Sequence, residues 1–283
     1  MQDKIVIVTG ANAGMGIATV TELARQGARV IMACRSRERG ETALAKAIQD
    51  SGSSRIELML CDLGSLESIR AFAEQFKSSH GTLDVLINNA GVVALKRQTT
   101  SDGFESMIGV NHLGHFLLTN LLLEPLIAAP QGRIVSVSSG AHKWGRIHWD
   151  DPHLTAGYNV AKGYAQSKLA NILFTRELAE RLRDTRVTVN SLHPGAVSTQ
   201  IGIDRKTGFG KGVHALLRPF FLTPEEGART AVYLATSPDV TKVSGTYFIK
   251  SKPAPVTDAA ADKLQAERLW TWSEQQVGLL QHA

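Results

Sequence analysis

Two side chains in this sequence, Tyr164 and Lys168, have the types and the spacing needed for acid–base chemistry. Residues four positions apart lie on the same face of a helix. A free phenol has a pKa of about 10 and is a poor base at neutral pH, whereas a nearby ammonium group favours the phenolate and lowers that pKa. The pair therefore indicates a proton donor and acceptor whose pKa is shifted toward neutral pH. The same spacing in isolation is common and more often structural.

A second candidate lies near the N-terminus, where residues 9–16 read Thr-Gly-Ala-Asn-Ala-Gly-Met-Gly between an apolar run and a helical pattern. Glycines let the backbone turn sharply and approach a pyrophosphate, and the N-terminus of the next helix offers free N–H groups to it. The spacing is G-x-x-x-G-x-G rather than the commoner G-x-G-x-x-G. The context predicts a dinucleotide site formed by Gly10, Asn12, Gly14, Met15 and Gly16.

The end of the second apolar run bears on which dinucleotide binds. Cys34 stands where NAD enzymes of this architecture carry an acidic residue that binds the ribose 2′-hydroxyl, and Arg35 follows it. A carboxylate would repel a 2′-phosphate, whereas a guanidinium can bind one. We therefore expect NADP(H) rather than NAD(H), with a solvated Arg35 as the alternative. Asp62 and Leu63 are expected at the adenine edge, or Asp62 caps the next helix.

Seven short runs rich in Val, Ile and Leu alternate with helical patterns along the chain. The runs span residues 4–9, 28–34, 55–61, 83–88, 133–138, 187–192 and 245–250. The helical patterns span roughly residues 14–26, 37–50, 66–78, 102–129, 160–183 and 224–236. Continuous apolar runs are typical of parallel strands covered on both faces. The sequence therefore predicts an α/β fold, a single doubly wound Rossmann-type domain over residues 1–283 with a seven-stranded parallel sheet and helices on both faces.

Two long connections, residues 140–159 and 195–223, follow predicted strands and should lie at the carboxyl edge of the sheet, where such sheets bind ligands. The second connection holds glycines and many apolar residues, which predicts a mobile lid over an apolar substrate pocket. Trp144 and Trp149 of the first connection are candidates for the opposite wall. A helical tail is expected over about residues 257–283, with its helix around residues 262–278.

The composition is that of a globular protein, with 43% hydrophobic and 20% charged residues and a net charge of +5. The basic residues are dispersed, which argues against a nucleic-acid partner. No apolar stretch has the length of a transmembrane anchor or the form of a signal peptide. Two cysteines cannot form a disulfide framework. We therefore expect a cytoplasmic protein without a membrane anchor.

His112 and His115 lie three positions apart in a helical pattern, an arrangement that can suggest zinc. No glutamate adjoins His112, and no third ligand follows at a metal-binding spacing. Both side chains are therefore expected to pack or to form hydrogen bonds, and no metal is expected.

Taken together, the motifs resemble those of short-chain dehydrogenases/reductases with a Tyr-x-x-x-Lys pair, over about residues 4–250. They are the loop at residues 9–16, Asn88-Asn89-Ala90-Gly91, Asn111, Val137-Ser138-Ser139, Tyr164 with Lys168, and residues 193–199. Within that family the chain resembles retinol dehydrogenases and the oxidoreductase domain of WW-domain oxidoreductases. The stretches that carry this narrower resemblance are residues 33–35, 111–116, 145–148, 167–171 and 268–270.

The resemblance implies an oxidoreductase that moves a hydride between NADP(H) and a carbonyl or alcohol group of an apolar substrate, retinoid-like or long-chain. Tyr164 would be the general acid in reduction and the base in oxidation. Lys168 would lower the pKa of Tyr164 and bind the nicotinamide ribose. Ser139, rather than Ser138, would polarise the substrate oxygen, and Asn111 would hold a water that connects Lys168 to solvent.

The resemblance also implies the sheet order 3-2-1-4-5-6-7 and further cofactor contacts. The adenosine ribose would be lined by Asn89, Ala90 and Gly91, and the nicotinamide by Pro194, Gly195, Val197 and Thr199. A homodimer or homotetramer would form through the predicted helices at residues 102–129 and 160–183. The alternative function is a non-catalytic NADP(H) sensor that acts through a partner, because a fold does not determine a function.

Overall fold

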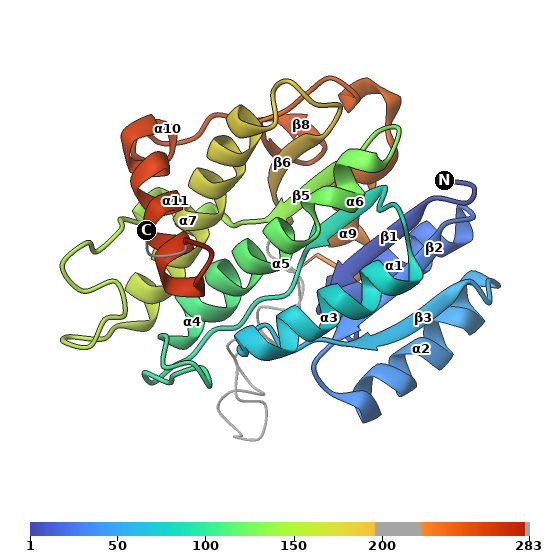
Figure 1. Ribbon diagram of the computed structural model, residues 1–283, viewed down its shortest axis with the longest axis horizontal. Helices are drawn as coiled ribbons and strands as arrows, with labels where there is room; N and C mark the ends of the chain where they lie inside the picture. The colour runs from blue at the N-terminus through green and yellow to red at the C-terminus, as the bar shows by residue number, and fades with distance from the viewer. Residues whose placement is uncertain (196–221, 281–283) are drawn as a thin grey trace.

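The strands of the sheet lie in the order β3-β2-β1-β4-β5-β6-β7-β8 in the computed structural model, which describes residues 1–195 and 222–280 (Figure 1). The strands are β1 Ile5–Thr9, β2 Arg29–Cys34, β3 Ile56–Leu60, β4 Val85–Asn88, β5 Arg133–Val137, β6 Thr188–His193, β7 Tyr247–Ile249 and β8 Lys252–Pro253. The first seven pair in parallel, which confirms the predicted order. The eighth was not predicted. It is a two-residue antiparallel addition at the edge, too short to show as an apolar run.

The helices alternate with these strands. They are α1 Gly14–Arg25, α2 Arg37–Ser51, α3 Leu66–Ser79, α4 Ser106–Ile108, the π-helical turn η1 Gly109–Gly114, α5 His115–Leu121, α6 Leu123–Ala128, the 3₁₀ turn η2 Gly140–Trp144, α7 Val160–Arg181, α9 Pro224–Thr236, the 3₁₀ turn η4 Pro238–Val240, α10 Asp258–Ala261 and α11 Lys263–Val277. The last of these matches the predicted tail helix closely.

Each strand sends alternate side chains to opposite faces of the sheet, and a separate apolar cluster lies on each face. In β1, Val6 and Val8 pack with residues of α1 and α9, whereas Ile7 packs with residues of α3, α5 and α7. All three side chains are fully buried. This two-sided burial is the reason that the strand sequences are continuously apolar, and it leaves the carboxyl ends of the strands as the place where ligands can enter.

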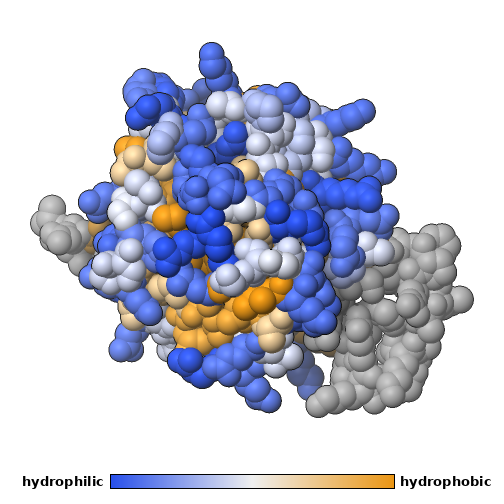
Figure 2. Space-filling model, turned by 90° about the vertical axis from the view of Figure 1, so that its right-hand side faces the viewer, coloured by the Kyte–Doolittle hydropathy of each residue, from blue (hydrophilic) through white to orange (hydrophobic). Residues whose placement is uncertain are grey.

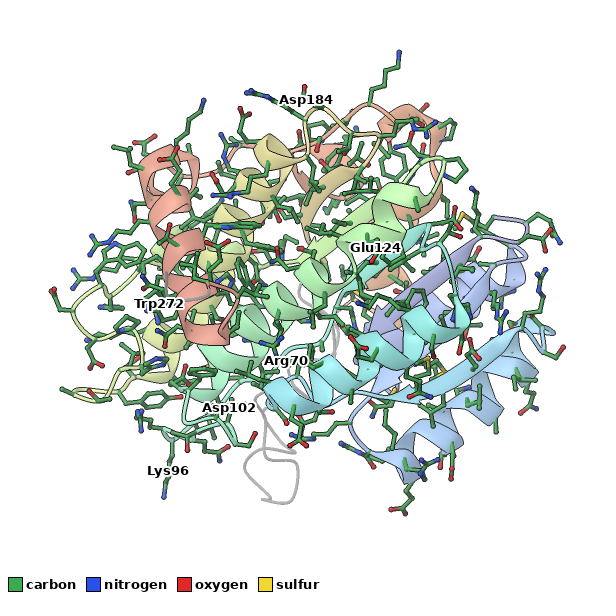
Figure 3. The ribbon with its side chains drawn as sticks, viewed as in Figure 1. Arg70, Lys96, Asp102, Glu124, Asp184 and Trp272 are labelled. Carbon is green, nitrogen blue, oxygen red and sulfur yellow. The ribbon has the colours of Figure 1, made fainter. Side chains whose placement is uncertain are left out.

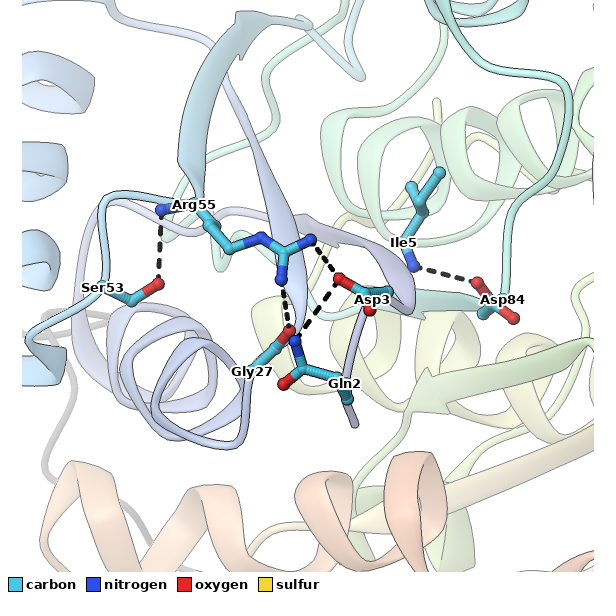
Figure 4. A network of polar contacts seen from close by, with 7 residues as sticks. All are labelled: Gln2, Asp3, Ile5, Gly27, Ser53, Arg55 and Asp84. Carbon is cyan, nitrogen blue, oxygen red and sulfur yellow. Dashed lines mark hydrogen bonds and ion pairs between the residues drawn. The ribbon is translucent and has the colours of Figure 1, made fainter.

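The N-terminal segment is tied to the strands beside it by a polar network (Figure 4). The Arg55 guanidinium pairs with the Asp3 carboxylate and donates to the Gly27 carbonyl. The backbone N–H of Ile5 donates to Asp84 Oδ2 over 2.9 Å. These contacts hold the start of β1 against β2, β3 and β4, and β1 leads directly into the glycine loop.

The predicted helix at residues 102–129 is wrong as a single element, because the structure divides it into α4, η1, α5 and α6. A Cβ at Gly114 would collide with the Leu63 carbonyl, so this segment lies unusually close to the β3–α3 connection. Leu122 leaves the helical conformation at φ −104° and ψ 8°. Pro125 lacks the N–H that would continue the ladder. A π-helical turn inside a helix often marks a functional site.

Helix α11 packs across α7 and α5 on the front of the molecule in Figure 1. Trp270 lies against Phe116 and Phe174, with ring centroids 4.9 and 6.0 Å away. Figure 3 labels Trp272 on the same helix and Arg70, whose guanidinium donates to the Val277 carbonyl. The α5 and α7 surface expected to carry a subunit interface is therefore partly occupied by the chain's own C-terminal helix.

The face seen in Figure 2, on the side of α2 and the edge strand β3, is mostly hydrophilic with one hydrophobic area in its lower half. Among the residues that the structure describes, no helix has both the length and the apolar character needed to cross a bilayer.

Candidate active site

A cleft of about 930 Å³ opens where β1, β2, β4, β5 and β6 end. It brings together most of the residues expected to bind a dinucleotide. Those that line it are Gly10, Asn12, Gly14, Met15, Gly16, Arg35, Asp62, Leu63, Asn89, Ala90, Gly91, Tyr164, Lys168, Pro194 and Gly195. Val197 and Thr199 lie outside the described residues, as does most of the predicted lid.

The glycine loop at one end of the cleft has no room for side chains at its closest approaches. Gly10 has φ +63°, and a Cβ there would lie 2.8 Å from the Ala90 Cα. A Cβ on Gly16 would collide with the Gly10 carbonyl. The N-cap residue of α1, Ala13, makes no side-chain cap, so no side chain blocks the approach of an anion to the first N–H groups of that helix. These features fit a pyrophosphate bound across the loop.

Two guanidinium groups reach the part of the cleft beyond β2. Arg35 follows the buried Cys34, and Arg39 in the first turn of α2 also lines the cleft. A role for Arg39 was not predicted from the sequence. The alternation of arginine at positions 35, 37 and 39 was the available signal. Asp62 does not cap α3. Ser65 does, and Asp62 Oδ1 accepts the Gly64 N–H over 2.9 Å while facing the cleft.

Tyr164 and Ser139 meet at the other end of the cleft. Ser139 lies two residues beyond the end of β5 and caps η2, accepting the Ala141 N–H at 3.2 Å, and it is close enough to Tyr164 to lower the pKa of the phenol. The hydroxyl of Ser138 donates to the Lys168 carbonyl at 2.7 Å. Both serines line the cleft, but the Ser138 hydroxyl is already bonded to the backbone of α7, which leaves Ser139 as the serine available to a reacting group beside the phenol.

Lys168 lies one turn beyond Tyr164 on α7 and is buried. Its Nζ donates to the Val137 carbonyl over 3.1 Å and lies 5.6 Å from the centroid of the Tyr164 ring. Burial lowers the pKa of this ammonium group to about 8. At neutral pH the side chain is therefore mostly charged, yet close enough to its pKa to exchange a proton.

The expectation that Lys168 lowers the pKa of Tyr164 stays a prediction. Burial raises the pKa of the phenol, and the nearby Ser139 hydroxyl only partly opposes this. In this geometry the Lys168 ammonium group donates to the Val137 carbonyl. A phenol with a raised pKa keeps its proton at neutral pH, which suits a group that must donate that proton.

Asn111 lies behind the cleft wall, fully buried in the π-helical turn. Its Oδ1 accepts the Val92 N–H at 2.7 Å, and its Nδ2 donates to the Val92 carbonyl and to Ser167 Oγ. Both N–H groups of the side-chain amide are therefore engaged with protein groups, and its oxygen accepts one bond. A Cβ built on Gly91 would lie 3.6 Å from both Asn111 Oδ1 and Lys168 Nζ, which shows how closely the two approach the same point.

Three aromatic side chains near the site behave differently from one another. Trp144 lines the cleft and is 83% exposed. Trp149, a candidate for the same pocket, instead lies under the Arg268 guanidinium, 4.2 Å from its ring. His193 lines the cleft with a buried Nδ1 that has no hydrogen-bond partner among the described residues, and sequence reasoning had assigned it no role.

Comparison with known proteins identifies the family. The short chain dehydrogenase family matches residues 4–208. This chain belongs to that family, whose members are oxidoreductases that use a nicotinamide cofactor. Such a cofactor fits the glycine loop, the uncapped N-terminus of α1 and the cleft that connects them to Tyr164.

Individual relatives agree with this assignment. Retinol dehydrogenase 14 of Mus musculus is 47% identical over 300 residues, which cover 99% of this chain and 87% of that protein. A solved structure of an uncharacterised protein from Mycobacterium paratuberculosis is 36% identical, with a TM-score of 0.79 over 98% of this chain and 94% of that one. The structure of actinorhodin polyketide ketoreductase with NADPH shares the fold at 24% identity and a TM-score of 0.67, over 87% and 96% of the two chains.

Proposed function

We propose that this protein reduces the carbonyl group of apolar substrates with NADPH and catalyses the reverse oxidation of the corresponding alcohols. The proposal rests on one observation. Tyr164, Ser139 and Lys168 lie together at one end of a cleft, and the glycine loop lies at its other end. No metal is needed, because a protonated phenol supplies the proton and a bound nicotinamide supplies or accepts the hydride.

Each of the three side chains has a separate task in reduction. Ser139 donates a hydrogen bond to the substrate oxygen and fixes its direction. Tyr164 donates its proton to that oxygen as negative charge develops on it. Lys168, with its pKa lowered to about 8, stabilises the phenolate that remains and binds the nicotinamide ribose, and the buried Asn111 turn holds its surroundings in place.

The preference for NADP(H) rests on Arg35 and Arg39. Both guanidinium groups line the cleft where the second strand ends, and no carboxylate precedes Arg35 to repel a 2′-phosphate. Paired guanidinium groups are well suited to bind a phosphate. The ketoreductase that shares the fold was solved with NADPH, which agrees with this preference.

The apolar character of the substrate rests on the cleft wall beside Ser139. Trp144 exposes most of its ring there, and Val92 and Val93 line the same cleft. A large exposed aromatic ring at a cleft is a binding surface for apolar groups. The named activity of the mouse relative, a retinol dehydrogenase, agrees with a long apolar substrate.

We expect kcat/KM for unbranched aldehydes to rise with chain length from propanal to dodecanal. Each methylene that is fully buried against the cleft wall contributes about 0.8 kcal/mol, or about fourfold in kcat/KM. The measurement is the loss of NADPH absorbance with each aldehyde in turn. A flat series, or a preference for small charged carbonyl compounds, would overturn the apolar assignment and leave the reductase assignment standing.

The same series measured on Trp144→Ala tests the wall directly. We expect kcat/KM to rise less steeply with aldehyde chain length, because the ring that covers the alkyl chain of the substrate has been removed. Leu264→Ala is the matched control, since Leu264 is 76% exposed on α11 and does not line the cleft. An unchanged slope in Trp144→Ala would remove Trp144 from the substrate site.

A further inference from the structure

His115 joins two parts of the site that are far apart in the sequence. It is buried at the start of α5, immediately after the π-helical turn. Its Nε2 lies 2.9 Å from Thr9 Oγ1, at the start of the glycine loop. Its Nδ1 lies 3.1 Å from the backbone carbonyl oxygen of Asn111. One imidazole therefore connects the glycine loop with the turn that carries Asn111.

The partners of His115 determine which ring nitrogen carries the proton. A carbonyl oxygen can only accept, so Nδ1 must donate to Asn111. Nε2 then accepts the hydroxyl hydrogen of Thr9. The Thr9 oxygen is suited to this arrangement, because it already accepts the N–H groups of Asn89 and Ala90, each at 2.9 Å. The Thr9 hydroxyl has one other acceptor in reach, the Ile87 carbonyl, at a longer 3.4 Å. A neutral ring protonated on Nδ1 satisfies the Asn111 carbonyl and makes the shorter of the two bonds open to Thr9.

We propose that His115 is a positioning residue for the reaction, a neutral imidazole that holds the Asn111 turn against the wall of the cleft. The inference rests on the proposed function. Asn111 in turn binds both backbone groups of Val92, which lines the cleft, and the hydroxyl of Ser167, the neighbour of Lys168. A shift of the Asn111 carbonyl therefore moves the cleft wall and the surroundings of the Lys168 ammonium group together.

The surroundings of His115 keep it uncharged. Complete burial and the positive charge of Lys168 lower the pKa of the imidazole to about 4. His115 is thus not a proton donor or acceptor in the reaction at physiological pH. It acts through two fixed hydrogen bonds, and its effect on the rate must come from geometry.

The chain offers a matched control and a precedent for rescue. His112 lies one turn earlier, is equally buried, and binds a hydroxyl through Nε2, but its partner is Ser273 of α11, away from the cleft. Asn120, farther along α5, donates its Nδ2–H to the carbonyl of the residue four positions before it, Phe116, at 2.8 Å. Asparagine at position 115 can therefore make the same bond to the Asn111 carbonyl.

The kinetic test compares His115→Phe, His115→Asn and His112→Phe in NADPH-dependent reduction of decanal. We expect His115→Phe to lower kcat about tenfold or more with little change in KM, because small displacements of catalytic groups cost this much. His115→Asn should restore most of kcat, and His112→Phe should lower Tm while leaving kcat close to that of the wild type. Equal kcat in His115→Phe and His112→Phe, or no rescue by asparagine, would overturn the assignment.

A second measurement does not depend on activity. Nitrogen NMR of histidine-labelled protein reports the tautomer and the charge of each ring. We expect His115 to be neutral and protonated on Nδ1 from pH 5 to pH 8, and an Nε2-protonated or charged ring would overturn the proposal. If the wild type reduces no aldehyde, the proposed function fails. The tautomer, and whether the Asn111 amide resonances shift in His115→Phe and return in His115→Asn, then decide the role of His115.

Discussion

Replacing Tyr164 by phenylalanine is expected to lower kcat for aldehyde reduction by about 10²–10⁴-fold, the usual contribution of a general acid. The phenylalanine ring fills the same buried space but has no proton to donate. Burial raises the pKa of the Tyr164 phenol, so the wild-type side chain is protonated and ready to donate at neutral pH. The measurement is steady-state NADPH oxidation with decanal at several pH values.

The control for this variant is cofactor binding. The dissociation constant of NADPH, measured by fluorescence, should change little in Tyr164→Phe, because the glycine loop and the arginines are untouched. A variant that keeps more than about a tenth of the wild-type rate would contradict the assignment of Tyr164 as the proton donor. Ser138→Ala offers a second comparison, since Ser138 binds the Lys168 carbonyl and does not face Tyr164. It should cost less rate than Ser139→Ala.

Replacing Arg35 and Arg39 together by alanine is expected to weaken NADPH binding by two or more orders of magnitude and to leave NADH binding nearly unchanged. Each charge-assisted hydrogen bond contributes about 1.5–3 kcal/mol, or about 10- to 150-fold in the dissociation constant. Each single variant should show part of the loss. The measurement is the ratio of the two dissociation constants for wild type and variants.

Arg37→Ala is the matched control for this pair. Arg37 lies between the two arginines in the sequence, but its guanidinium pairs with Glu41 at 3.7 Å on the exposed side of α2 and does not line the cleft. Its removal should leave the ratio unchanged. A wild-type protein that prefers NADH, or a double variant that keeps the NADPH preference, would contradict the role given to Arg35 and Arg39.

Much of the fold could be predicted because the signals are local and repeated. The strands read as continuous Val, Ile and Leu runs, since both faces of the sheet are covered, and the glycine loop stands where a strand gives way to a helix. The order of the strands came from resemblance to a family, because nothing local in a sequence states which strands pair. The two-residue strand β8 and the division of the helix at residues 102–129 depend on tertiary contacts such as the approach of Gly114 to Leu63.

The site was predictable in its residue types and less so in its electrostatics. Tyr164 and Lys168 were found from spacing, but the direction of the Lys168 ammonium group toward the Val137 carbonyl depends on where β5 ends. Arg39 was given no role from the sequence, and His115 was expected only to pack or to form hydrogen bonds. Arg39 reaches the cleft because α2 begins at Arg37, and His115 reaches Thr9 because a π-helical turn precedes α5. Such contacts emerge only when distant segments are placed together.

The measurement that tests the central claim most directly follows the hydride itself. The protein is incubated with decanal and with NADPH that carries deuterium at the reactive carbon of the nicotinamide, and the product is analysed by mass spectrometry. We predict decanol with one deuterium on its hydroxyl-bearing carbon from the wild type, and almost none from Tyr164→Phe. A protein that binds the labelled NADPH tightly but transfers no deuterium to decanal or to any other apolar aldehyde would contradict the account and favour a cofactor-sensing role.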